Sequence, residues 1–71
     1  MKKKILVTGG SGFIGTNLID YYKDSYEVLN LDNTKPRNGS HSIYWKDIDI
    51  LDKEKTLQLF NDFQPHYVLH M

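Results

Sequence analysis

Residues 5–15 read Ile-Leu-Val-Thr-Gly-Gly-Ser-Gly-Phe-Ile-Gly. The unbroken apolar run at residues 5–7 is typical of a parallel strand that is covered on both faces. Glycines follow at once, and apolar side chains then recur at helical spacing as far as Tyr22, which indicates an amphipathic helix. Such a helix directs unpaired N–H groups and the positive end of its dipole at the glycine turn. The stretch therefore predicts a strand, a turn and a helix that together offer a phosphate site.

Two glycine patterns overlap in this turn. Gly10, Gly12 and Gly15 match G-x-G-x-x-G, while Gly9, Gly12 and Gly15 match the longer G-x-x-G-x-x-G. In the usual division of roles, the first glycine makes the turn, the second lets a pyrophosphate approach the main chain, and the third lets helix and strand pack closely. Glycine inside a helix costs about 0.5–1 kcal/mol relative to alanine, so we expect a side chain at Gly15 to collide with the sheet. The alternative is a glycine-rich turn that binds nothing.

The rest of the chain alternates apolar runs with polar breaks. We expect a second strand at residues 27–31, a polar loop at 32–41, a third strand at 42–46, a helix at 53–63 and a fourth strand at 66–71. This order predicts an α/β protein whose parallel strands are joined by right-handed crossovers. The predicted fold is the N-terminal part of a Rossmann fold: a parallel sheet of about four strands with flanking helices, in the order third, second, first, fourth.

Asp32 ends the second predicted strand and lies about 23 residues after Gly9. An acidic residue about 20 residues beyond the first glycine of a dinucleotide-binding turn binds the ribose hydroxyls. The same carboxylate would repel a phosphate on the 2′ oxygen, so the sequence favours NAD as the cofactor. Lys35 and Arg37 in the following loop could instead serve a 2′-phosphate, which keeps NADP open as an alternative.

The composition limits the classes of partner. The chain has 71 residues, nine basic and nine acidic side chains and no cysteine, which together indicate one small domain without disulfides or thiolate metal sites. The balanced charge favours neither nucleic acid nor an anionic membrane. The apolar stretch after Lys4 is too short for a membrane span or a signal-peptide core. We therefore expect a soluble, cytoplasmic protein that binds neither nucleic acid nor membrane.

No metal site is predicted. His41, His66 and His70 do not have the spacing of a ligand pair one helical turn apart, and we expect structural roles for them, with His70 in a buried strand. The acidic residues at positions 47, 49 and 52 lack the glycine and the closing glutamate of a calcium loop. Capping of the next helix is the simpler interpretation of these aspartates.

The stretch from Thr8 to Gly15 resembles the T-G-x-x-G-F-I-G signature of the extended short-chain dehydrogenases/reductases, the NAD-dependent epimerase/dehydratase family that acts on nucleotide sugars. Leu31-Asp32-Asn33 resembles the family's ribose-binding pair, and Asp47-Ile48 resembles the pair that flanks the adenine ring. Val68-Leu69-His70-Met71 resembles the fourth strand of the family. The resemblance implies cofactor-binding roles for Gly9, Gly12, Phe13, Ile14, Gly15, Asp32, Asn33, Asp47 and Ile48.

By the same resemblance, Phe13 and Ile14 would offer backbone N–H groups to the pyrophosphate. We expect their side chains to pack beneath the helix.

Members of the family carry a catalytic Tyr-x-x-x-Lys and a serine or threonine well beyond the fourth strand. None of the five tyrosines of this chain stands in such a motif, so no catalytic residue is assigned. We expect residues 1–71 to form a partial NAD-binding domain, inactive alone, with the catalytic and substrate portions absent.

The resemblance implies a parent enzyme that oxidises a nucleotide sugar transiently by hydride transfer to NAD and then epimerises, dehydrates or reduces it. A non-catalytic dinucleotide sensor of the same fold and an NADP-dependent reductase are the alternatives. The fourth strand would form an apolar edge, and such edges recruit other chains. We therefore expect a homodimer.

Overall fold

The computed structural model describes residues 2–71. Its elements in chain order are β1 (Lys3–Thr8), α1 (Phe13–Tyr22), β2 (Tyr26–Asp32), the short 3-10 helix η1 (Gly39–Tyr44), β3 (Trp45–Asp47), α2 (Lys53–Phe63) and β4 (Tyr67–His70). The four strands form one parallel sheet in the order β3-β2-β1-β4. The predicted fold class and strand order are confirmed.

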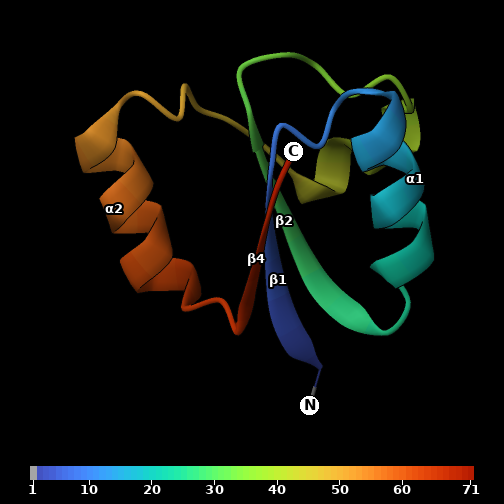
Figure 1. Cartoon of the computed structure of the whole chain (residues 1–71), viewed down its shortest axis with the longest axis horizontal. Coiled ribbons are helices and arrows are strands. Elements are labelled where there is room, and N and C mark those ends of the chain that lie inside the picture. Colours follow the sequence, from blue (N-terminus) through green and yellow to red (C-terminus); the bar gives the residue numbers. More distant parts are fainter. Residues whose placement is uncertain (1) are drawn as a thin grey trace.

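The sheet lies between two layers of helix (Figure 1). α1 and η1 cover one face, and α2 lies on the opposite side. The core on the α1 side consists of Ile5, Val7, Val28 and Ile19, which are at most 7% exposed. α2 buries no residue fully, and its partly buried positions recur at spacings of three and four residues: Thr56, Leu59, Phe60 and Phe63. The strand residues on the α2 face are nevertheless buried, since Leu6 and Leu31 are 0% and 1% exposed.

The predicted third strand at residues 42–46 is wrong in its position. Residues 39–44 form η1, and the strand is Trp45–Asp47. The cause is local hydrogen bonding: Asn38 Oδ1 accepts the Ser40 N–H at 3.0 Å, and the Ser42 hydroxyl donates to the Gly39 carbonyl at 2.8 Å. Such side-chain bonds to the backbone compete with strand pairing. The apolar side chain that suggested a strand, Ile43, is 81% exposed.

The glycine turn requires glycine at two positions for different reasons. Gly9 has a φ of 70°, a left-handed conformation that side chains rarely adopt. At Gly15 the reason is space, because an added Cβ would lie 2.4 Å from the Gly10 Cα. The expected collision at Gly15 therefore involves the backbone of the turn rather than the sheet, and α1 begins directly against that turn.

His41 joins η1 to α1. Its ring is 1% exposed, and its Nε2 lies 2.7 Å from Asp20 Oδ1. Because an ionised carboxylate only accepts hydrogen bonds, the ring nitrogen is the donor. The expected structural role of His41 fits this contact.

Within residues 2–71, no helix has the length and apolar composition that a membrane span requires.

The contact at Gly15 predicts the effect of a methyl group. The Gly15→Ala variant should lose at least about 1 kcal/mol of unfolding free energy, because overpacking against rigid backbone outweighs the gain of about 1 kcal/mol in helix propensity. Gly39→Ala is the control, since no atom lies within 4 Å of its added Cβ, and it should change stability by less than about 0.5 kcal/mol. Urea unfolding measures both, and equal stability of the two variants would contradict the contact.

The Asp20 contact predicts a pH dependence. The hydrogen bond from His41 holds the pKa of the Asp20 carboxyl below its ordinary value of 3.8. The stabilisation is therefore present above about pH 3.8 and is lost as the pH falls through the lowered pKa of the folded state. Asp20→Asn should lower the urea midpoint at pH 7, and the difference from the unmodified chain should disappear at acid pH. The exposed Asp24, changed to Asn, is the control; a pH-independent loss in Asp20→Asn would disprove the linkage.

Candidate cofactor-binding site

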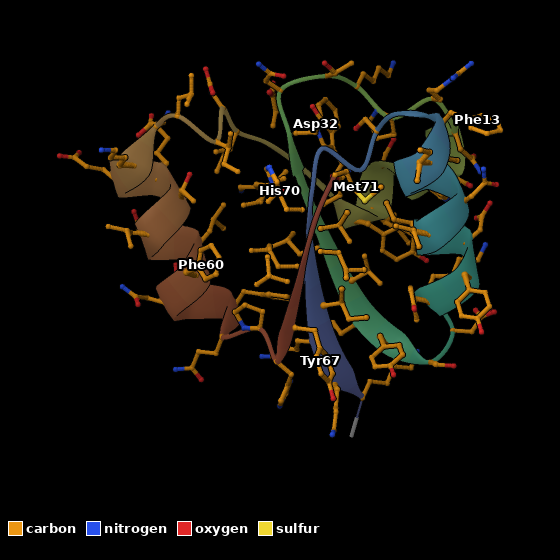
Figure 2. All side chains as sticks on the ribbon, in the orientation of Figure 1. Phe13, Asp32, Phe60, Tyr67, His70 and Met71 are labelled. Atoms are coloured by element: carbon orange, nitrogen blue, oxygen red, sulfur yellow. The ribbon has the colours of Figure 1, made fainter. Side chains whose placement is uncertain are left out.

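The carboxyl ends of β1, β2 and β4 meet at one edge of the sheet. Thr8 pairs with Leu31 on one side and with His70 on the other. The glycine turn follows β1 at this edge, and its first amide, Gly9 N–H, donates to the Leu31 carbonyl at 2.9 Å. Figure 2 shows Asp32, His70 and Met71 near this end of the sheet, with Tyr67 at the other.

Asn30 holds the next amide of the turn. Its side chain is completely buried; its Oδ1 accepts the Gly10 N–H at 2.8 Å, and its Nδ2 donates to Ser11 Oγ at 3.2 Å. Sequence reasoning missed Asn30 because it treated residues 27–31 as one apolar run. The available signal was a polar residue inside that run, two positions before Asp32 and so on the same face of the strand.

Asp32 joins the turn to β2 and to the loop that follows. Its Oδ2 accepts the Ser11 N–H at 3.1 Å, and its Oδ1 accepts the Thr34 N–H at 2.9 Å. Its backbone carbonyl accepts from Trp45 Nε1 at 2.8 Å and from the Ile48 N–H at 3.3 Å. The predicted ribose-binding acid is thus held in place from three segments of the chain.

The first turn of α1 presents amides without a capping side chain. The N-cap residue, Gly12, makes no side-chain hydrogen bond, and an added Cβ there would meet no atom within 4 Å. The Phe13 and Ile14 side chains are 69% and 64% exposed, so the expectation that they pack beneath the helix is wrong. Figure 2 shows Phe13 pointing away from the sheet. The helix start lies too close to the turn to bury them, since only Gly15 and Ile19 of α1 are buried.

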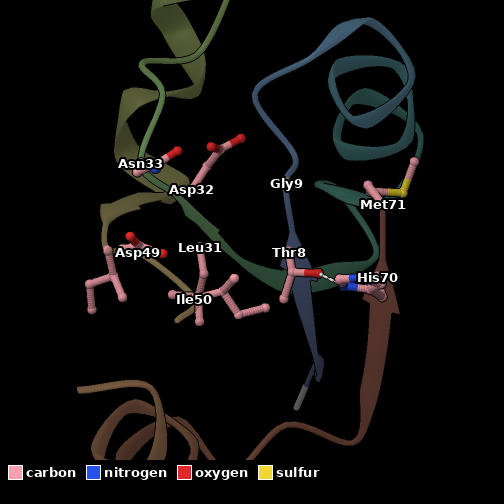
Figure 3. Close-up of a pocket in the computed structure, with 10 residues that line it drawn as sticks. Thr8, Gly9, Leu31, Asp32, Asn33, Asp49, Ile50, His70 and Met71 are labelled. Atoms are coloured by element: carbon pink, nitrogen blue, oxygen red, sulfur yellow. Dashed lines mark hydrogen bonds between the residues drawn. The ribbon is translucent and has the colours of Figure 1, made fainter. Parts of the chain in front are cut away.

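A pocket of about 140 Å³ opens beside Asp32 (Figure 3). Its lining comes from the ends of three strands and from the segment after β3: Thr8, Gly9, Leu31, Asp32, Asn33, Ile48, Asp49, Ile50, His70 and Met71. Four predicted site residues therefore share this pocket: Gly9, Asp32, Asn33 and Ile48. The other five do not line it: Gly12, Phe13, Ile14 and Gly15 belong to the turn and the start of α1, and Asp47 lies exposed at the end of β3.

Thr8 and His70 meet on the wall of this pocket. Thr8 Oγ1 lies 2.6 Å from His70 Nδ1, and Figure 3 shows the two side chains turned toward one another. The expectation that His70 is buried is wrong, because β4 is an edge strand and only Leu69 within it is partly buried.

Among residues 2–71, no three histidine, aspartate or glutamate side chains are grouped as a metal site would require.

A comparison with known families fits this geometry. A family model described as "NAD dependent epimerase/dehydratase family" matches residues 5–71. The chain belongs to this family. The cofactor of the epimerase/dehydratase family is NAD, which agrees with the dinucleotide favoured by the Asp32 argument. The resemblance stated from the glycine signature is confirmed.

Relatives of this epimerase/dehydratase chain are much longer than it is. A Sinorhizobium fredii protein named "Probable dTDP-glucose 4,6-dehydratase" is 38% identical over 78 residues, covering 96% of this chain and 22% of the relative. UDP-glucose 4-epimerase from Thermotoga maritima, solved with UDP-glucose, is 32% identical with a TM-score of 0.83, covering 96% of this chain and 23% of that one. The enzyme WbmG from Bordetella bronchiseptica, solved with NAD and UDP, is 26% identical with a TM-score of 0.86, covering all of this chain and 25% of that one. The chain thus spans about a quarter or less of these relatives.

Proposed function

We propose that this chain is the part of an NAD-dependent nucleotide-sugar epimerase or dehydratase that binds adenosine and pyrophosphate. Residues 1–71 would form a partial NAD-binding domain, with the catalytic and substrate portions in a longer parent. The observation that carries the proposal is the 3.1 Å bond from Ser11 N–H to Asp32 Oδ2. It sets a ribose-binding carboxylate beside the turn that leads into the uncapped start of α1.

The start of α1 fits a pyrophosphate. Open space at Gly12 would let phosphate oxygens approach the main chain, and the amides of Phe13 and Ile14 would donate to them. Hydrogen bonds to a charged group contribute about 1.5–3 kcal/mol each, and the positive end of the helix dipole adds to the attraction. The exposed Phe13 and Ile14 side chains leave these amides at the surface of the turn.

The pocket beside Asp32 fits the adenosine. Asp32 and Asn33 would bind the ribose hydroxyls, since both line the pocket. Ile48, which is 8% exposed, offers an apolar wall for the adenine ring. Asp47 would reach the ring from the neighbouring position at the end of β3. Together with Gly9 and Gly15 of the turn, these residues would bind and orient the cofactor, and none of them is assigned a catalytic role.

Bound NAD supplies a hydride acceptor, so the parent would act on a nucleotide sugar by transient oxidation. The names of the relatives support both an epimerase and a dehydratase, and two of the solved relatives hold UDP-glucose or UDP. We place the parent in the cytoplasm. Nothing in the chain's own charge or motifs assigns a nucleic-acid or membrane partner.

The role of Asp32 predicts cofactor preference. The chain should bind NAD more tightly than NADP, and Asp32→Asn should weaken NAD binding by about 10- to 100-fold, the equivalent of a charge-assisted hydrogen bond worth about 1.5–3 kcal/mol. The loss for NADP should be smaller, because the variant also removes repulsion of the 2′-phosphate. Calorimetric titration measures both ligands.

Asp62→Asn, on the exposed part of α2, is the control for this titration and should leave both affinities unchanged. Tighter binding of NADP than of NAD by the unmodified chain would overturn the Asp32 argument and favour the reductase alternative.

The β4 edge predicts self-association of the 71-residue chain. β4 is the outer strand of the sheet, and Tyr67 and Val68 are each 47% exposed. Unpaired apolar edges recruit further strands, so the chain should form dimers, and Val68→Lys should shift it toward monomer. Ile43→Lys, at an exposed apolar position on η1, should leave the oligomeric state unchanged. Light scattering checks both, and a monomer at high concentration would count against the homodimer.

A further inference from the structure

Two side chains of β2 hold two consecutive amides of the glycine turn. Asn30 and Asp32 lie two positions apart and so project from the same face of the strand. Asn30 Oδ1 accepts the Gly10 N–H at 2.8 Å, and Asp32 Oδ2 accepts the Ser11 N–H at 3.1 Å. Neither amide is therefore free to bind a ligand in this conformation.

Asn30 is the more constrained of the two. It is 0% exposed, whereas Asp32 is only partly buried. Both polar atoms of its amide group are used, since Nδ2 donates to Ser11 Oγ at 3.2 Å. The Ser11 side chain is itself 1% exposed. A buried amide with both groups satisfied by one turn fixes that turn in one conformation.

The Asn30 side chain leaves no room for a side chain at Gly10. A Cβ at Gly10 would lie 2.6 Å from Asn30 Oδ1, and a Cβ at Gly15 would lie 2.4 Å from the Gly10 Cα. The Gly10 backbone is thus confined between the Asn30 amide on one side and the start of α1 on the other. Movement of Asn30 would release the turn and the first amides of the helix together.

We propose that Asn30 is a positioning residue for the pyrophosphate of the cofactor. By binding Gly10 N–H, it fixes the turn so that the amides left for a diphosphate are those of the helix start, Phe13 and Ile14. The turn is then ordered before the ligand arrives, and binding does not bear the cost of ordering it. This inference rests on the proposed function, because it concerns how NAD is held.

If Asn30 positions the turn for the pyrophosphate, its loss should weaken the binding of ligands that contain phosphate and spare ligands that lack it. Asn30→Leu removes both hydrogen bonds at similar side-chain size. It should weaken NAD binding at least tenfold and change adenosine binding less than twofold, because adenosine uses Asp32 and the pocket. Ser11→Ala is the matched variant: it removes only the Nδ2 contact, keeps the bond to Gly10 N–H, and should stay within threefold of the unmodified chain for NAD. Titrations with NAD and with adenosine, followed by NMR, give these affinities, and circular dichroism confirms that each variant is folded.

The inference can also be tested on the unmodified chain, so the test does not depend on whether Asn30→Leu folds. In hydrogen exchange without NAD, the Gly10 amide should be protected, and NAD should shift the Phe13 and Ile14 amide resonances more than that of Gly10. A freely exchanging Gly10 amide, or a largest NAD shift at Gly10, would overturn the inference. So would a folded Asn30→Leu that binds NAD like the unmodified chain, or that loses NAD and adenosine affinity equally. Absence of NAD binding by the unmodified chain would instead refute the proposed function.

Discussion

The confinement of the Gly10 backbone is the constraint on which the rest of the structure depends. The Asn30 side chain of β2 lies against one side of it, and Gly15 of α1 lies against the other. A Cβ added at Gly10 would collide with Asn30 Oδ1, and a Cβ added at Gly15 would collide with the Gly10 Cα. This contact sets how near α1 comes to the sheet and therefore where its first amides lie. It also explains why the helix contributes only Gly15 and Ile19 to the buried interior. The backbone of α1 packs directly against the backbone of the turn, so the larger side chains of the first helical turn remain exposed.

The backbone N–H groups near this contact fall into two sets. Backbone donors of the turn are used internally by Asn30 and Asp32, while those of the helix start are left without a capping side chain. A buried donor without a partner costs about 1–3 kcal/mol, so the first set must be satisfied by the protein. The second set lies at the surface, where water or an anion can serve. The turn thus separates structural amides from amides that can bind a ligand.

The sequence predicted what depends on local pattern. The glycine spacing and the apolar run before it fixed the strand, turn and helix, and the position of Asp32 followed from the end of the next apolar run. The third strand was misplaced because Asn38 and Ser42 bond to nearby backbone, a competition that apolar pattern does not report. Thr8 and His70 were missed as site residues because their contact joins two strands far apart in sequence, and Asn30 was missed because it lies inside a run that was treated as apolar. The exposure of Phe13 and Ile14 depends on the closeness of α1 to the turn, which spacing alone does not give.

The two sides of the sheet differ in a way that bears on the site. On the α1 side, the strands, the helix and η1 enclose a buried core, and the buried His41 is bound to the exposed Asp20 of α1. On the other side α2 buries no residue fully, although Leu6 and Leu31 of the sheet are buried there, and Val68 of the β4 edge is 47% exposed. Asn30, Ser11, Gly10 and Gly15 are all buried on the α1 side, so the geometry of the turn is maintained by contacts that do not involve α2 or the outer edge of β4. The pocket is different, because His70 and Met71 of its lining come from β4 and its continuation. Whatever pairs with β4 should therefore affect the pocket beside Asp32 more than the glycine turn.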